Sequence, residues 1–265
     1  MRTRRAAADR AWQLRTNARR PPGLMLTVTG PSAAEPMRAS PPLSGTPRDG
    51  PSGSGTSRGR PAASVNVRGS PRSVVRMTYT PAWAEDTAGQ LLAASLPRRW
   101  AHTQQVAAAA QSLAPVLGRD ADLLTAAAWL HDVGYAPPLA RTGFHSLDGA
   151  RYLRDTEHAH SLLCRLVAHH SCAQVEADER GLGAELAGEF TPAPGALADA
   201  MIYSDMTTGP DGQRLPADQR LAEILSRYGP DHVVSRSIKR SAPVLSAAVA
   251  RVARQLEHAS HAAAR

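Results

Sequence analysis

A histidine and an aspartate stand side by side at the end of an apolar segment, as His131 and Asp132. The pattern predicts a helix over Ala121–Leu130, with Asp120 as its N-cap and Gly134 as a left-handed stop just past its end. The pair is therefore expected at a helix C-terminus, where the chain turns and neighbouring side chains can converge. Imidazole and carboxylate form a mixed nitrogen and oxygen site, which suits Fe, Mn, Zn or Mg.

Two further residues can be matched with this pair because helical spacing directs them inward. His102 shares a predicted helix face with Val106, and Asp205 lies on one stripe with Leu197 and Met201. An unpaired buried carboxylate would cost several kcal/mol or be neutralised, so a cation or metal is the simplest partner for Asp205. In a helical bundle such side chains meet in the interior, and they would leave metal positions open for water and a substrate oxygen.

The elements that must position these residues are all predicted to be helical. Alanine is abundant and aromatic residues make up 4% of the chain, which favours helices, and no stretch shows a strand pattern. Helices are expected over Asp86–Leu96, Pro97–Leu117 (with Pro115 disturbing the last turn), Ala121–Leu130, a short segment that ends near Arg154, Glu157–His170, a segment from Pro194, and two or three segments in the C-terminal third. The sequence thus predicts an all-α bundle.

The charge divides the chain into two parts. Residues 1–76 hold fourteen arginines and three acids, whereas residues 77–265 hold seventeen basic residues and twenty acids. The first part is rich in Arg, Pro, Gly and Ser, and is expected to be a disordered extension. Three alternatives stay open: a basic arm that binds nucleic acid or an acidic surface, a transit peptide, or an over-long start with the true one at Met77. Residues 77–265 form the predicted helical domain.

The composition also limits the location and the partners. Cys164 and Cys172 do not form a CxxC motif, and a reducing cytoplasm is expected rather than a disulfide framework. No run approaches the length of a membrane span, so no membrane contact is expected. Because the foldable part is mildly acidic, nucleic acid is an unlikely partner. The sequence gives no indication of the oligomeric state.

The order of these residues resembles the HD-domain superfamily of metal-dependent phosphohydrolases. The likeness covers about residues 95–260 and rests on three phrases: AAWLHDVG at 127–134, LVAHH at 166–170 and LADAMIYSD at 197–205. The resemblance implies an HD-domain helical bundle and hydrolysis of a phosphate ester or anhydride, often of a nucleotide. It also implies that the first metal is bound by His102, His131, Asp132 and Asp205.

Further ligands follow from the same resemblance. Two-metal members of the superfamily place additional ligands where this chain has His145, His169 and His170. By that analogy Asp132 bridges two ions, with His145 and one or both of the neighbouring pair on the second. The expected cofactor is one or two divalent ions, and Asp132 and His145 are the expected catalytic residues. If only one metal binds, the additional imidazoles could instead donate to phosphate or act as a general acid.

The chain departs from the superfamily at the phosphate contact. Many members carry a lysine just after the His-Asp phrase, and this chain has Tyr135 there. Arg141 and Arg151 are the nearest guanidinium substitutes, with bidentate phosphate geometry available to each. Thr207 lies in the loop over 206–212 that directly follows Asp205, and this loop is either part of the substrate entrance or a simple turn.

Three functions are compatible with this pattern. The leading hypothesis is a metal-dependent phosphohydrolase that uses metal-activated water on a small phosphorylated molecule, with a nucleotide as the default substrate. The second is a di-iron oxygenase of the same superfamily. The third is a non-catalytic ligand-sensing domain with a basic, nucleic-acid-binding arm.

Overall fold

The computed structural model describes residues 79–263, and the predicted extension over residues 1–76 lies outside them. Within 79–263 all regular structure is helical, and strand-type pairing is limited to an isolated bridge between Thr208 and Arg214. The prediction of an all-α fold is confirmed. None of the helices in this range is both long and apolar enough to cross a membrane. The helices are α2 (Pro81–Leu92), α3 (Pro97–Gln111), α4 (Ala114–Leu117), α5 (Ala121–Leu130), α6 (His145–Asp155), α7 (Ser161–His169), α8 (Ala173–Glu179), α9 (Gly183–Glu189), α10 (Gly195–Met206), α11 (Ala217–Arg227) and α12 (Val233–Ala263).

Prolines set several of the helix boundaries. The first helix begins five residues before the predicted Asp86, because Thr80 caps it by accepting a hydrogen bond from the amide of Trp83 and Pro81 occupies its first position. The segment predicted as one helix over Pro97–Leu117 is divided into α3 and α4. Pro115 lies in the first turn of α4, where its missing N–H costs no hydrogen bond.

Helix α5 is the central element of the bundle. Eight of its ten residues are buried, and it packs against α2, α3, α7 and α10. Its bounds coincide with the predicted Ala121–Leu130. Asp120 occupies the N-cap position, but its side chain makes no capping hydrogen bond. Because α5 is surrounded, residues at its C-terminal end lie inside the domain.

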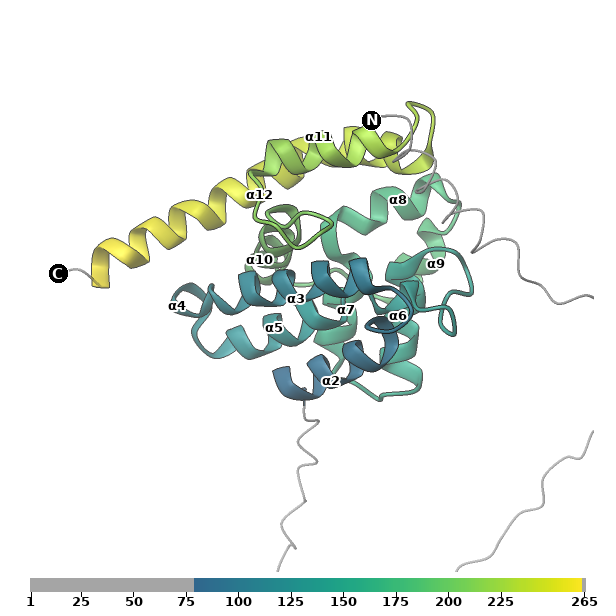
Figure 1. Ribbon diagram of the computed structural model, residues 1–265, viewed down its shortest axis with the longest axis horizontal. Helices are drawn as coiled ribbons and strands as arrows, with labels where there is room; N and C mark the ends of the chain where they lie inside the picture. Colours follow the sequence, from purple (N-terminus) through teal and green to yellow (C-terminus); the bar gives the residue numbers. More distant parts are fainter. Residues whose placement is uncertain (1–78, 264–265) are drawn as a thin grey trace, which may run out of the picture. The chain divides into compact units, whose positions relative to one another are not determined.

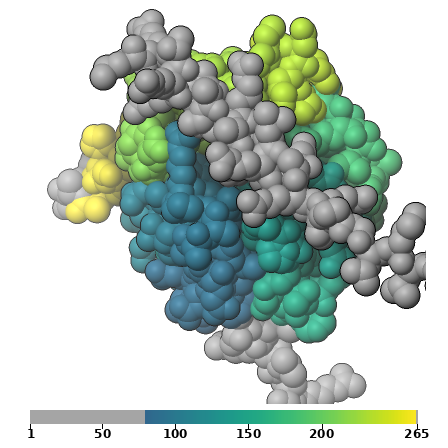
Figure 2. Space-filling model, turned by 45° about the vertical axis from the view of Figure 1, so that its right-hand side comes forward, coloured from purple at the N-terminus to yellow at the C-terminus, as the bar shows by residue number. Residues whose placement is uncertain are grey.

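The late helices cover one side of this core. Helices α11 and α12 both pack on α10, and α12 also contacts α8 (Figure 1). A second apolar cluster joins the three helices α10, α11 and α12: Ile202, Met206, Ile224, Leu245 and Ala248. In Figure 2 the early helices in blue and the middle helices in teal meet on one face, with yellow-green late helices above them. This arrangement places α11 over the end of α10, where Asp205 lies.

Candidate metal centre

The C-terminal end of α5 delivers His131 and Asp132 to the interior. His131 keeps helical backbone angles as the C-cap, and Asp132 leads into a 3-10 turn over Val133–Tyr135. The two residues are 1% and 2% exposed. His131 Nε2 lies 3.3 Å from Asp132 Oδ2, so the neighbouring side chains converge.

Gly134 brings the next helix to this pair, but not as the predicted left-handed stop, because its φ is not positive. A Cβ atom at Gly134 would lie 2.0 Å from the carbonyl oxygen of His145 and 2.6 Å from the amide nitrogen of Gly149. The missing side chain therefore lets the first turn of α6 pack directly on the turn after α5. As a result, His145 Nε2 lies 3.4 Å from Asp132 Oδ1.

Helices α3 and α10 contribute the remaining pair of predicted ligands. His102 Nε2 lies 3.2 Å from Asp205 Oδ1 and 3.9 Å from Asp132 Oδ2. Both His102 and Asp205 are buried. The structure thus brings together, from α3, α10 and the end of α5, the four residues that the sequence singles out for a first metal.

Main-chain carbonyls fix the orientation of three imidazoles. A carbonyl oxygen only accepts hydrogen bonds, so the ring nitrogen next to it carries the hydrogen and the other nitrogen, Nε2, faces the site. Nδ1 of each ring donates to a main-chain carbonyl oxygen: His102 to that of Gly209 at 2.9 Å, His131 to that of Ala128 at 2.7 Å, and His170 to that of Val167 at 2.7 Å. Nε2 of His131 is buried and has no hydrogen-bond partner. An orphaned nitrogen of this kind is what a metal ion would satisfy.

The potential ligands form two groups within residues 79–263. His102, His131 and Asp205 make up one group, and Asp132, His145 and His170 the other, with the ligand atoms of each group within 4.8 Å of one another. Asp132 has one oxygen toward each group, because Oδ2 faces His102 and His131 and Oδ1 faces His145. Nitrogen and oxygen donors in this arrangement fit one or two divalent first-row ions.

The carboxylates of both groups are held in their charged form. Burial alone would raise the pKa of Asp132, but the charges of Arg99 and His131 outweigh it and hold the pKa well below its usual value. Arg99 Nη1 donates to Asp132 Oδ2 at 2.7 Å. The pKa of Asp205 is also lowered, because its contact with His102 and the nearby positive charge of His131 and Arg220 outweigh burial. Both carboxylates are thus in the charged form that binds a metal ion.

The imidazoles differ from one another in their protonation. Burial lowers the pKa of His145 and of His170, and neighbouring histidines lower both further. These two rings are therefore neutral near pH 7, which is the form that binds metal. Burial also acts against protonation of His131, but the charges of Asp132 and Asp205 outweigh it and raise its pKa.

Tyr135 lies between a cation and a histidine. The guanidinium carbon of Arg99 lies 4.0 Å from the centroid of the Tyr135 ring, and the His145 ring stacks on Tyr135 with a centroid distance of 4.0 Å and an interplanar angle of 14°. Two groups this close to one ring must occupy its opposite faces. Arg99 therefore supplies a positive charge beside the position where many superfamily members carry the lysine.

The structure does not bring the predicted ligand His169 into either group. His169 closes α7, and its Nε2 donates to the carbonyl oxygen of Phe190 at 2.6 Å. The backbone leaves the helix at His170, whose ring then faces His145 with an Nε2–Nε2 distance of 3.1 Å. We therefore retain His170, and not His169, in the ligand set.

Three residues predicted to bind substrate also lie elsewhere. Arg151 is held by ion pairs with Glu185 and Glu189, which neutralise its charge away from the site. The side chain of Arg141 is exposed. The hydroxyl of Thr207 donates to the carbonyl oxygen of Tyr203, one turn earlier, at 2.7 Å. Of the four residues predicted to bind substrate, all of them described in the structure, Tyr135 alone lines the cavity beside the ligand groups.

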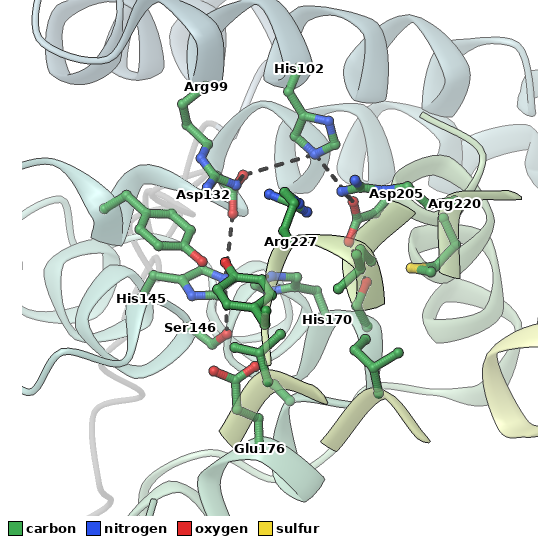
Figure 3. Close-up of a pocket in the computed structure, with 18 residues that line it drawn as sticks. Arg99, His102, Asp132, His145, Ser146, His170, Glu176, Asp205, Arg220 and Arg227 are labelled. Carbon is green, nitrogen blue, oxygen red and sulfur yellow. Dashed lines mark hydrogen bonds and ion pairs between the residues drawn. The ribbon is translucent and has the colours of Figure 1, made fainter. Parts of the chain in front are cut away.

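A cavity of about 110 Å³ adjoins the two ligand groups (Figure 3). This volume suits hydrated ions or a phosphate-sized group. Its charged lining includes three arginines that the sequence analysis did not select: Arg99, Arg220 and Arg227. Arg99 precedes His102 by three residues, and Arg220 precedes Arg227 by seven, so helical periodicity could have placed each on an inward face. Ser171 was also missed, and its hydroxyl donates to Asp205 Oδ2.

Comparison with protein families agrees with the geometry. The family model of the HD domain matches residues 99–206. This segment contains both ligand groups and ends at the last residue of α10. This segment of the chain therefore resembles an HD domain, in agreement with the resemblance that the sequence motifs carry. No individual curated protein and no solved structure matches the chain.

Proposed function

We propose that this chain is a metal-dependent phosphohydrolase that cleaves a phosphate ester or anhydride of a small phosphorylated molecule, with nucleotides as the first class to test. The observation that carries the proposal is the placement of Asp132. Its two oxygens face two separate groups of ligands, His102 with His131 and Asp205, and His145 with His170. A shared carboxylate between two cation sites is suited to phosphoryl chemistry.

The chain's own residues have distinct parts in this proposal. His102, His131 and Asp205 would hold one ion, His145 and His170 the other, and Asp132 both. A bound ion supplies an activated water and stabilises negative charge on the phosphoryl oxygens. The protein contributes preorganisation, because main-chain carbonyls orient three of the imidazoles before any ion binds.

The proposed substrate is a free small molecule and not nucleic acid. The cavity is small, and residues 77–265 carry three more acidic than basic residues. We also propose a cytoplasmic location, which agrees with the free thiols of Cys164 and Cys172. Salt-dependent DNA binding that disappears on deletion of residues 1–76 would contradict this part of the proposal and favour the sensor with a basic arm.

The test combines metal analysis with phosphate release from a panel of nucleotides and other phosphoesters. The full chain is expected to hold stoichiometric metal and to release phosphate in a metal-dependent way. Asp132→Ala should lose both properties, whereas the matched control His169→Gln should keep both, because His169 faces Phe190. The absence of stoichiometric metal from the full chain would contradict the proposal. Iron-dependent oxygen uptake without phosphate release would favour the di-iron oxygenase.

A further inference from the structure

Helix α11 presents two arginines to the cavity from outside the segment that matches the HD domain. Arg220 and Arg227 both line the cavity, and their spacing of seven residues places them on the same face of α11. The matched segment ends at residue 206, so both arginines belong to the part of the chain that follows it. Figure 3 shows them near Asp205 and His170, with Arg99 also at the cavity.

Arg220 is buried with part of its hydrogen-bonding capacity unused. It is 5% exposed, and its Nε has no hydrogen-bond partner. Its Nη1 donates to Glu223 Oε2 at 2.5 Å, and its Nη2 lies 3.9 Å from Asp205 Oδ1. A buried guanidinium with an unsatisfied donor is costly, and a ligand with several acceptor oxygens would remove that cost.

Arg227 shares its carboxylate partner with Arg220. Arg227 Nε lies 2.9 Å from Glu223 Oε1, while the second oxygen of Glu223 accepts from Arg220. One carboxylate thus serves two guanidinium groups, so this face of α11 has a surplus of positive charge. Arg220 also lies near the carboxylate of Asp205. That carboxylate lies closer to His102 than to Arg220, and it is one of the candidate metal ligands.

The charge balance of the cavity supports an anionic occupant. Three arginines and three carboxylates line it, and two of those carboxylates, Asp132 and Asp205, are candidate metal ligands. The lining is balanced without metal, and each divalent ion would leave it more positive. We propose that Arg220 and Arg227 of α11, with Arg99 of α3, form an anion subsite that binds the phosphate group of the substrate; this inference rests on the proposed function. Guanidinium groups suit phosphate because they can donate two parallel hydrogen bonds.

Calorimetric titration of inorganic phosphate into the Mn²⁺-loaded full chain tests the subsite. The wild type should bind phosphate, and Arg227→Gln should bind it about tenfold more weakly or worse, because a charge-assisted hydrogen bond is lost. Arg220→Gln should have a similar effect and Arg220→Lys a smaller one. Because Arg220 is buried and its loss can unfold the chain, the partly exposed Arg227 makes the test independent of folding. The matched control is Arg240→Gln, which removes an exposed arginine that pairs with Glu179 outside the cavity.

The outcomes separate the subsite from the proposed function. Metal content should be equal in wild type and in the arginine variants. If the wild type binds no phosphate, or if Arg227→Gln and Arg220→Gln bind it as tightly as the wild type, the inference is overturned. If phosphate binds through these arginines but no phosphoester is cleaved, the subsite stands and the hydrolase proposal fails. If esters are cleaved with arginine-independent phosphate binding, the hydrolase stands and the subsite falls.

Discussion

Arg99 donates a 2.7 Å hydrogen bond to Asp132 Oδ2, the same oxygen that faces His102 and His131. The guanidinium thus neutralises the carboxylate at the point where a metal would bind it. Arg99 is anchored there by its contact with the ring of Tyr135. In the metal-free protein the arginine therefore acts as an internal counter-ion for the candidate metal centre.

Replacing this counter-ion should lower the unfolding free energy of the metal-free protein and raise its affinity for metal. Arg99→Met keeps the apolar stem but leaves Asp132 buried without its cation, and we expect a loss of about 1–3 kcal/mol of unfolding free energy in chelator. Mn²⁺ should then bind about tenfold more tightly, because it no longer faces the positive charge of Arg99. Urea unfolding with and without Mn²⁺ measures both effects. Equal destabilisation of the metal-free and metal-loaded forms would show that Arg99 is not a counter-ion of this centre.

Metal stoichiometry should depend on which ligand is removed. Asp132→Asn is expected to reduce binding at both ligand groups, because each of its oxygens faces one of them. His145→Gln should remove only the ion of its own group and leave about half of the metal. His169→Gln should leave the metal content unchanged, since its ring is turned to Phe190. Elemental analysis of the purified proteins checks these expectations, and full metal retention in Asp132→Asn would contradict the shared-ligand geometry.

Much of the fold follows from local sequence signals. The bounds of α5 and the inward direction of His131 and Asp132 depend on apolar periodicity and on the end of one helix, which are local properties. His102 and Asp205 could be selected for the same reason, because each lies on a regular helical stripe. The sequence could not fix where the chain leaves the helical path after α7. The backbone leaves the helix at His170, two residues with positive φ angles follow, and His170 and not His169 faces the site.

The missed arginines have a different cause. The chain contains 31 lysine and arginine residues, so residue type alone does not distinguish a cavity lining from a solvated surface. Arg220 becomes a site residue only because α11 packs on the last turns of α10 through Ile224 and Met206. Helical periodicity can indicate the inward face of α11, but it does not show which helix that face packs against. Gly134 illustrates the same limit, because its role is a close approach to His145 and not a left-handed backbone conformation.

The metal-free protein should lose stability in acid through its two buried carboxylates. The pKa values of Asp132 and Asp205 are lower in the folded chain than in the unfolded chain. Their contribution is therefore fully present above the unfolded value, about pH 4, and is lost as the pH falls from there toward the folded values. Urea unfolding in the presence of a chelator, measured over this pH range, should show a smaller loss of unfolding free energy for Asp205→Asn than for the wild type. Parallel curves for the two proteins would contradict this linkage.

A methyl group at Gly134 should disturb both the fold and the second ligand group. In Gly134→Ala the new Cβ would meet the main chain at His145 and Gly149, which cannot move aside as a flexible side chain can. We expect a loss of about 2–3 kcal/mol of unfolding free energy, as for other overpacked interiors. The shift of α6 should also move His145 away from Asp132 and reduce the bound metal by about half. The matched control is Gly188→Ala in α9, where a Cβ meets nothing within 4 Å and a helical alanine should be neutral or stabilising by up to about 1 kcal/mol. Full stability and full metal content in Gly134→Ala would show that the contact between this turn and α6 does not position His145.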